Sequence, residues 1–284
     1  MENLETIARL VCIIAREAGD YIRKERAGFS QEKVERKHAH DYVSYVDKGS
    51  ERLIVKALQE LVPEAGFITE EGTTKSEELR VKSEESSAAQ PPLTWVIDPL
   101  DGTTNFIHGY APYAVSIALL KDKEIQLGVV YEVCANECFY AWKGGGAWVE
   151  TGSERGNRTS ERLQVGTSAI GDALLCLQLP YNSDAYKPVI TRLLQHFYGN
   201  VGSIRMIGSA AMALCYVAAG RLDAYAERYI SQWDYMAGAL IVKEAGGRVT
   251  NYDGSDDFTC GDSVVATNGI VHQSLLEGLK NALS

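Results

Sequence analysis

Apolar positions at helical spacing mark the start of the chain. They lie on one face of a helix with charged residues between them: Leu4, Ile7, Val11, Ile14, Ala18 and Ile22. This spacing predicts an amphipathic helix rather than a signal peptide. A polar connection over 30–49 ends in a short alternating strand, and a second amphipathic helix is predicted over 50–63, stopped by Pro63. The run GFIT, 66–69, then predicts a short strand.

Strand-like runs dominate the next part of the chain. They are separated by short polar turns and cover 93–97, 113–120, 125–132 and 137–142. This pattern predicts a mainly antiparallel sheet, which the Gly-rich run 143–148 closes. A glycine run can cradle phosphate, but neither a helix nor a P-loop lysine follows here, so we predict a turn.

Short strands alternate with helical patterns beyond about residue 160. Strands are predicted over 173–178, 204–208, 222–227, 247–250 and 263–267, and helices over 184–197, 209–220, 233–246 and 272–283. This rhythm predicts an α/β layer, so the whole chain is expected to be α+β and layered, with two sheets. We expect one compact unit with an N-terminal half over 1–150 and a C-terminal half over 151–284. The Ser/Ala/Pro-rich, mixed-charge residues 73–92 are predicted to be an exposed, mobile insertion.

Composition limits the classes of function. With 284 residues, 45% of them hydrophobic and 23% charged, the chain has the make-up of a soluble globular protein, and no apolar run is long enough to cross a bilayer. We therefore expect a cytoplasmic protein without a membrane partner. The formal net charge of -10 argues against nucleic acid as a partner. An anionic substrate would then need metal ions or local dipoles to hold it.

The six cysteines do not form a metal-binding pattern. The spacing of CANEC, 134–138, suggests a metal site, but no second Cys/His pair completes a tetrahedral set. Buried thiols near a strand-to-strand turn explain the pair better. This usage fits a reducing compartment.

The stretch WVIDPLDGTTNFIHG, 95–109, carries the strongest chemical signal. Pro99 biases Asp98 toward an extended conformation, so we expect Asp98 to be the last residue of a strand and the chain to bend before Asp101. The two carboxylates can then converge, with the carbonyl of Leu100 between them, and such oxygen ligands suit a hard cation such as Mg²⁺. The alternative is that the two acids only cap a turn. That alternative explains poorly why an apolar strand should end in two acids.

The residues that follow offer a phosphate cradle. Gly102 allows close backbone approach, and Thr103 or Thr104 is a suitable N-cap for a short helix over 104–108. Free N–H groups at a helix start bind phosphate, assisted by the helix dipole. The stretch thus combines cation ligands with an anion site.

Other acids are candidate partners for this pair. Glu70 and Glu71 end a strand, and strand ends are where sites gather in layered α/β structures, although Glu71 is expected to be solvated. Asp47 precedes the predicted second helix, where a role as its cap is the alternative. Asp234 lies in the first turn of a predicted helix, where it could merely complement the dipole.

Taken together, these pieces resemble a known family. WVIDPLDGTTNFIHG and WDYMAGALIVKEAGG, 233–247, are similar to the two signature motifs of the inositol monophosphatases. The acids after GFIT and in VSYVD also fall where that family has acids, and the resemblance runs from about Leu4 to Leu283. The superfamily consists of Mg²⁺-dependent, Li⁺-sensitive phosphomonoesterases and includes 3′-phosphoadenosine 5′-phosphate nucleotidases and fructose-1,6-bisphosphatases.

The resemblance implies a fold and a metal centre. The family fold is a five-layered α-β-α-β-α sandwich, usually a homodimer. By motif, Glu70, Asp98 and the carbonyl of Leu100 would bind a first Mg²⁺, and Asp98, Asp101 and Asp234 a second. A third ion would depend on Glu70, which gives two or three Mg²⁺ per subunit.

The resemblance also implies roles in the reaction. Asp47, Thr103 and Glu70 would be catalytic, with Asp47 and Thr103 orienting and helping to deprotonate a metal-activated water for in-line attack. Gly102 and Thr103 would hold the phosphate through their N–H groups. Four positions match those that contact the inositol ring: Asp101, Ala210, Glu227 and Asp234.

Three hypotheses about function remain at this point. The first is hydrolysis of myo-inositol monophosphates or similar small sugar phosphates to the alcohol and phosphate. The second is a 3′(2′),5′-bisphosphate nucleotidase; the GSAA run at 208–211 and the spacing of Glu227 and Asp234 favour inositol instead. The third is a binding or regulatory protein with a vestigial site, which would require a substituted acid that the sequence does not show.

Overall fold

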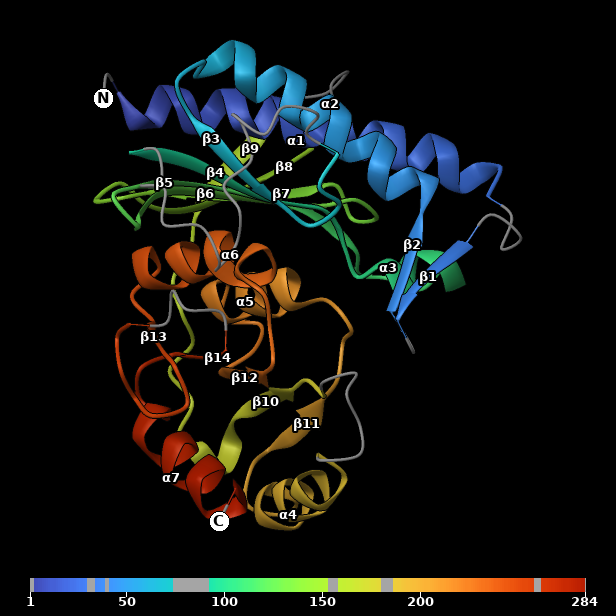
Figure 1. Ribbon diagram of the computed structural model, residues 1–284. Coiled ribbons are helices and arrows are strands. Elements are labelled where there is room, and N and C mark those ends of the chain that lie inside the picture. The colour runs from blue at the N-terminus through green and yellow to red at the C-terminus, as the bar shows by residue number, and fades with distance from the viewer. Residues whose placement is uncertain are drawn as a thin grey trace.

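The computed structural model describes residues 3–29, 34–38, 41–73, 92–152, 158–179, 186–257 and 262–283. The insertion predicted over 73–92 falls outside these residues except for its two end positions. Helices and two sheets are stacked in layers from one end of the molecule to the other (Figure 1). No helix in the described ranges has the length and apolar character that a membrane span needs.

Two helices form the outer layer over the first sheet (Figure 1): α1 (Leu4–Ala27) and α2 (Tyr45–Leu61). The first helix is confirmed. The second begins at Tyr45 rather than Ser50, because Ser44 caps it and accepts the N–H of Val46 at 3.1 Å. The connection before α2 holds two antiparallel strands where one was predicted: β1 (Val34–His38) and β2 (Asp41–Ser44).

The first sheet has seven strands and is antiparallel except for its first pair, as predicted. Its strands in spatial order are β3 (Gly66–Thr69), β4 (Leu93–Asp101), β5 (Ala114–Lys121), β6 (Glu124–Glu132), β7 (Glu137–Trp142), β8 (Gly146–Thr151) and β9 (Thr159–Arg162). The prediction that 143–148 closes the series was wrong. All four residues of β9 are exposed, so the strand has no apolar alternation to reveal it. The sheet therefore continues past residue 150, and the division into halves at that point stays a prediction.

The Gly-rich run after β7 is a hairpin turn, as predicted. Its N–H groups already hold an anion from the protein itself, because Gly144 and Gly146 each donate to the carboxylate of Glu244 at 2.8 Å. Gly144 adopts φ 75°, in the left-handed region that favours glycine. The turn thus ties the sheet to the helix that carries Glu244.

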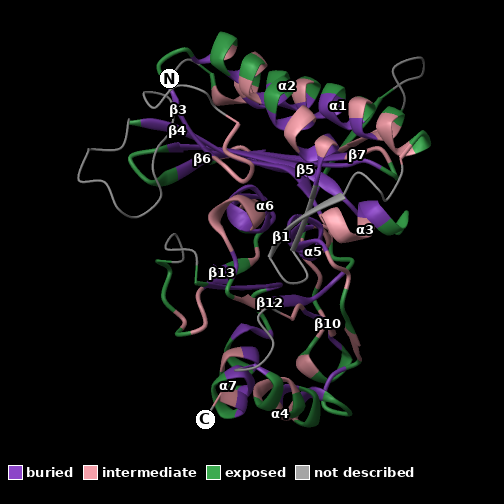
Figure 2. Ribbon diagram, turned by 45° about the vertical axis from the view of Figure 1, so that its right-hand side comes forward, coloured by how far each residue is buried: buried purple, intermediate pink, exposed green. Residues whose placement is uncertain are grey.

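Two helices fill the layer between the sheets: α5 (Ala210–Ala218) and α6 (Gln232–Glu244). Almost every residue of α5 is buried, as expected of a helix that is apolar on all sides (Figure 2). Glycines allow the close packing. A Cβ on Gly128 of β6 would stand 2.5 Å from the carbonyl oxygen of Ala237 in α6, and one on Gly238 would stand 2.6 Å from the Cβ of Leu214 in α5.

A second sheet and two outer helices complete the stack (Figure 1). The sheet order is β11 (Ser203–Arg205), β10 (Leu174–Leu177), β12 (Ala224–Arg228), β14 (Ser263–Thr267) and β13 (Arg248–Thr250). The outer helices are α4 (Lys187–Phe197) and α7 (His272–Leu283). The layers therefore run helix, sheet, helix, sheet, helix, which confirms the five-layered sandwich.

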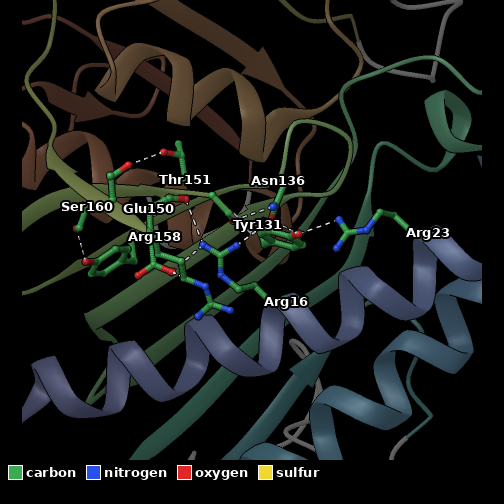
Figure 3. A network of polar contacts seen from close by, with 11 residues as sticks. Arg16, Arg23, Tyr131, Asn136, Glu150, Thr151, Arg158 and Ser160 are labelled. Atoms are coloured by element: carbon green, nitrogen blue, oxygen red, sulfur yellow. Dashed lines mark hydrogen bonds and ion pairs between the residues drawn. The ribbon is translucent and has the colours of Figure 1, made fainter. Parts of the chain in front are cut away.

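Helix α1 is fixed to the first sheet by a buried arginine (Figure 3). Arg16, 5% exposed, donates to Glu150 Oε1 and Asn136 Oδ1, both at 2.9 Å. Arg23, further along the helix, donates to the hydroxyl of Tyr131 at 2.8 Å. The outer layer is thus held by directed polar contacts in addition to apolar packing.

Candidate metal and phosphate site

Asp98 and Asp101 face the same side of the sheet because β4 contains a bulge. Asp98 pairs with Ser116 and Asp101 with Ala114, so three steps along β4 correspond to two along β5. In a regular strand, residues three apart point to opposite faces, and the extra residue of a bulge corrects this. The strand therefore does not end at Asp98 as predicted. It continues to Asp101, and the missing N–H of Pro99 is tolerated at the bulge.

Three carboxylates meet between the first sheet and α6. Oxygen atoms of Asp98, Asp101 and Asp234 all lie within 4.8 Å of one another. Asp98 and Asp101 are 2% and 6% exposed, and Asp234 lies in the first turn of α6. Asp234 Oδ2 also accepts the N–H of Ser231 at 2.8 Å. Asp234 thus both stabilises the start of α6 and belongs to the carboxylate cluster.

The cluster is electrostatically costly when it is empty of cations. Burial raises the pKa of Asp98 and of Asp234 well above the usual range, and the charge of Glu70 raises both further. Burial raises the pKa of Asp101 to about 7. Buried carboxylates this close repel each other, and hard oxygen donors of this kind fit a divalent cation. The residues present therefore fit a metal ion.

Glu70 stands at the margin of the cluster. It follows β3, and its N–H continues the parallel ladder by donating to the carbonyl of Ile97 at 3.3 Å. Its carboxylate is not part of the group of three aspartates whose oxygen atoms lie within 4.8 Å of one another. Its negative charge nevertheless raises the pKa of Asp98 and of Asp101. Glu71, expected to be solvated, is half-buried.

Asp47 is fully buried and connects the start of α2 to the motif. Its Oδ2 accepts the N–H and the hydroxyl of Ser44 at 2.9 and 2.6 Å, and its Oδ1 accepts the hydroxyl of Thr103 at 2.9 Å. Thr103 Oγ1 also lies 3.0 Å from the carbonyl oxygen of Leu100. Burial raises the pKa of Asp47. Asp47 thus stabilises the helix start and also faces the site.

Gly102 is the N-cap of α3 (Thr103–His108), with φ 84°. The prediction of Thr103 or Thr104 as N-cap was wrong, because Thr103 is the first helical residue. A Cβ on Gly102 would stand 3.1 Å from the carbonyl oxygen of Gly208 and 3.2 Å from that of Pro112. The close approach requires glycine here.

The start of α5 holds Asp101 in place. The N–H groups of Ala210 and Ala211 donate to its carboxylate at 3.3 and 3.1 Å, and the hydroxyl of Ser209 also donates to it. Ala210, expected to contact substrate, therefore directs its N–H to Asp101 in this structure. Sequence reasoning missed Ser209, for which the signal was a serine directly before the apolar run of the helix.

Glu227 on β12 completes the acidic surroundings. It accepts the hydroxyl of Tyr225 at 2.5 Å, and burial raises its pKa to about 8. The charges of Asp101 and Glu227 affect each other, as do those of Asp234 and Glu227. Glu227 thus lies close enough to the cluster for its charge to interact with the charges of the aspartates.

Residues from distant segments support these side chains and were not found from the sequence. Asn105 Nδ2 donates to the carbonyls of Pro112 and Ile207, both at 2.8 Å, and so joins the motif to the loop before α5. Ser50 donates to the carbonyl of Pro99 at 2.9 Å. Neither residue carries a local pattern that reveals its partner.

The order of the layers defines an α/β sandwich, and the acidic cluster between its two sheets is a candidate metal site. The chain belongs to the inositol monophosphatase family, whose model matches residues 3–284. It is 34% identical over 271 residues to inositol-1-monophosphatase of Mesorhizobium japonicum, covering 95% of this chain and 94% of that protein. It is 32% identical to Nus factor SuhB of Escherichia coli K12 over 270 residues, with 95% and 94% covered.

A solved structure supports the same assignment. The extragenic suppressor protein suhB from Bartonella henselae superposes with a TM-score of 0.83 at 32% identity, covering 97% of this chain and 99% of that one. Family and relatives together identify the chain as a phosphoric monoester hydrolase. The resemblance derived from the two motifs is thereby confirmed.

Proposed function

We propose that the protein hydrolyses monophosphate esters of myo-inositol or of similar small sugar alcohols, with Mg²⁺ as cofactor. The observation that carries the proposal is the cluster of Asp98, Asp101 and Asp234 within 4.8 Å, next to a helix start, in a chain of this family. Glu70, Asp98 and the Leu100 carbonyl would hold one ion, and the three aspartates a second. A third would depend on Glu70.

Bound Mg²⁺ would supply positive charge that lowers the pKa of water and offsets charge on the phosphate oxygens. Side chains of the protein would accept the proton that the attacking water loses. The single hydroxyl proton of Thr103 can point to Asp47, which leaves a lone pair of Thr103 Oγ1 to accept a proton of the attacking water. Burial raises the pKa of Asp47, so it is a stronger base than a solvated aspartate. It can therefore take the hydroxyl proton of Thr103 as Thr103 Oγ1 takes a proton from the attacking water.

The remaining predicted residues serve the substrate. The N–H groups of Gly102 and Thr103, at the start of α3, would hold the phosphate. Asp101, Glu227 and Asp234 would face the alcohol, together with Ala210. Glu227, whose pKa is raised by burial to about 8, would form a hydrogen bond with a sugar hydroxyl.

One assay tests the proposal. Phosphate release is measured from inositol 1-phosphate, 3′-phosphoadenosine 5′-phosphate and fructose 1,6-bisphosphate in Mg²⁺, each with and without Li⁺. The expected result is preference for inositol 1-phosphate and inhibition by Li⁺. Preference for the nucleotide would favour the nucleotidase instead, and no release from any ester would favour the binding role. Light scattering on the same preparation should show a homodimer.

A further inference from the structure

Glu51 is a fully buried carboxylate in the middle of α2. Its Oε2 accepts the N–H of Glu71 at 2.8 Å, and its Oε1 accepts the N–H and the hydroxyl of Thr73, both at 2.6 Å. The two oxygens thus hold the backbone on either side of Gly72, which has φ 60°. One side chain of α2 therefore fixes the turn that directly follows Glu70.

The position of Glu70 has two constraints. On one side its N–H donates to the carbonyl of Ile97 in β4, the strand that carries Asp98. On the other side the next residue is held by Glu51. Since Glu70 stands at the margin of the aspartate cluster, a small shift of this turn would change how far its carboxylate reaches toward the proposed cations.

Helix α2 supports the site through three side chains on one face. Asp47 accepts the hydroxyl of Thr103, Ser50 donates to the carbonyl of Pro99, and Glu51 holds the turn after Glu70. Ser50 and Glu51 follow Asp47 by three and four residues, so both lie beside it on the helix surface. Each one reaches a different segment of the site.

We infer that Glu51 is a positioning residue, which sets the affinity for divalent cations by fixing Glu70. The inference rests on the proposed function, in which Glu70 is a cation ligand. The contacts require a carboxylate, because both oxygens accept a backbone N–H. An amide offers one oxygen, and in either orientation its NH₂ group faces an N–H donor. Glu51→Gln is therefore a nearly isosteric change that loosens only this clamp.

The chain offers a matched control. Glu244 makes the same kind of clamp, accepting the N–H groups of Gly144 and Gly146 on either side of Gly145. That turn joins β7 and β8 and contributes no residue to the site. Glu244→Gln thus loses comparable hydrogen bonds without touching the turn after Glu70.

Calorimetric titration of Mg²⁺ into the metal-free protein is the test, with thermal unfolding of each metal-free variant alongside. We expect about tenfold weaker binding in Glu51→Gln, since supporting hydrogen bonds typically change metal affinity by 10–100-fold. Wild-type affinity is expected in Glu244→Gln. Activity of Glu51→Gln should also recover when the Mg²⁺ concentration is raised.

The outcomes separate the two ideas. If wild-type protein binds no Mg²⁺, the proposed function fails and this inference with it. If wild type binds Mg²⁺ and folded Glu51→Gln binds equally well, only the inference is overturned. If Glu51→Gln does not fold, Thr73→Val decides, since it removes one donor to Glu51. A loss of Mg²⁺ affinity in this variant supports the inference, and unchanged affinity overturns it.

Discussion

Thr103 and Asp47, 56 residues apart in the chain, are joined by a hydrogen bond of 2.9 Å between Oγ1 and Oδ1. The contact links the first turn of α3 to the first turn of α2. Asp47 Oδ2 accepts two hydrogen bonds from Ser44, so Oδ1 is the oxygen that faces the 95–109 motif and accepts the hydroxyl of Thr103.

Replacing Thr103 by valine should remove the proton path to Asp47. We expect kcat to fall by about 10²–10⁴, the usual range for a lost general-base contribution, at saturating Mg²⁺. Steady-state phosphate release measures this. Thr103→Ser keeps the hydroxyl and should retain most activity; equal rates in the serine and valine variants would show that the hydroxyl plays no part.

Replacing Asp98 by asparagine should have opposite effects on binding and stability. We expect calorimetric Mg²⁺ affinity to fall by at least about 100-fold, because a ligand of both proposed ions is lost. The metal-free protein should unfold at a higher temperature, by about 2–4 °C for each kcal/mol of repulsion removed. The exposed Asp172 provides the control, since Asp172→Asn should change neither quantity. Unchanged Mg²⁺ binding in Asp98→Asn would refute the metal assignment.

Gly102→Ala should damage both fold and site. The left-handed backbone and the two carbonyl contacts predict a loss of about 1–3 kcal/mol in the free energy of unfolding, with lower phosphatase activity. Gly144→Ala separates the causes, because Gly144 also has a positive φ but its added Cβ meets nothing within 4 Å. Chemical denaturation of both variants should show the larger loss in Gly102→Ala. Equal losses would mean that the contacts have no effect.

His272 should make stability depend on pH. Burial lowers its pKa from 6.5 to about 4, and its ring nitrogens lie 3.0 Å from Thr250 Oγ1 and 2.9 Å from Thr267 Oγ1. Between these pH values the unfolded chain binds the proton and the folded protein does not. Stability is therefore lost as the pH falls from about 6.5 toward 4, by at most about 1.4 kcal/mol per pH unit.

Denaturant titrations of His272→Gln across this range provide the check. The variant should show a flatter dependence of unfolding free energy on pH than wild type. A slope in His272→Gln equal to that of wild type would contradict the assignment.

Arg16→Met should destabilise the outer layer. The change removes a donor from Asn136 and from Glu150, which is 18% exposed and keeps Arg158 Nε at 3.7 Å, and losing such partly buried hydrogen bonds costs about 1–3 kcal/mol. Arg9→Met is the control, because Arg9 pairs with Glu5 on the surface, where such a pair contributes about 1 kcal/mol or less. Urea unfolding distinguishes the two. A loss in Arg16→Met no greater than in Arg9→Met would mean that the network contributes little.

Local patterns in the sequence determined most elements of the fold and the main acids of the candidate site. Helical spacing was sufficient for α1, which buries one face, and apolar runs bounded by polar turns were sufficient for β5 to β7, which are buried on both faces. The family's paired motif also marked Asp98, Asp101 and Asp234, which the structure brings together. The strand β9 was not predicted, because its residues are all exposed and show no apolar periodicity.

Only the tertiary structure determined how the carboxylates of the candidate site are oriented and which residues hold them. The bulge in β4 depends on the pairing register with β5, which no stretch of β4 encodes by itself. Glu51, Ser209 and Asn105 act on segments 20 to 108 residues away, so their partners are set by packing of the layers. The sequence determined which residues are able to bind a cation and phosphate, and long-range contacts between the layers determined where those residues point.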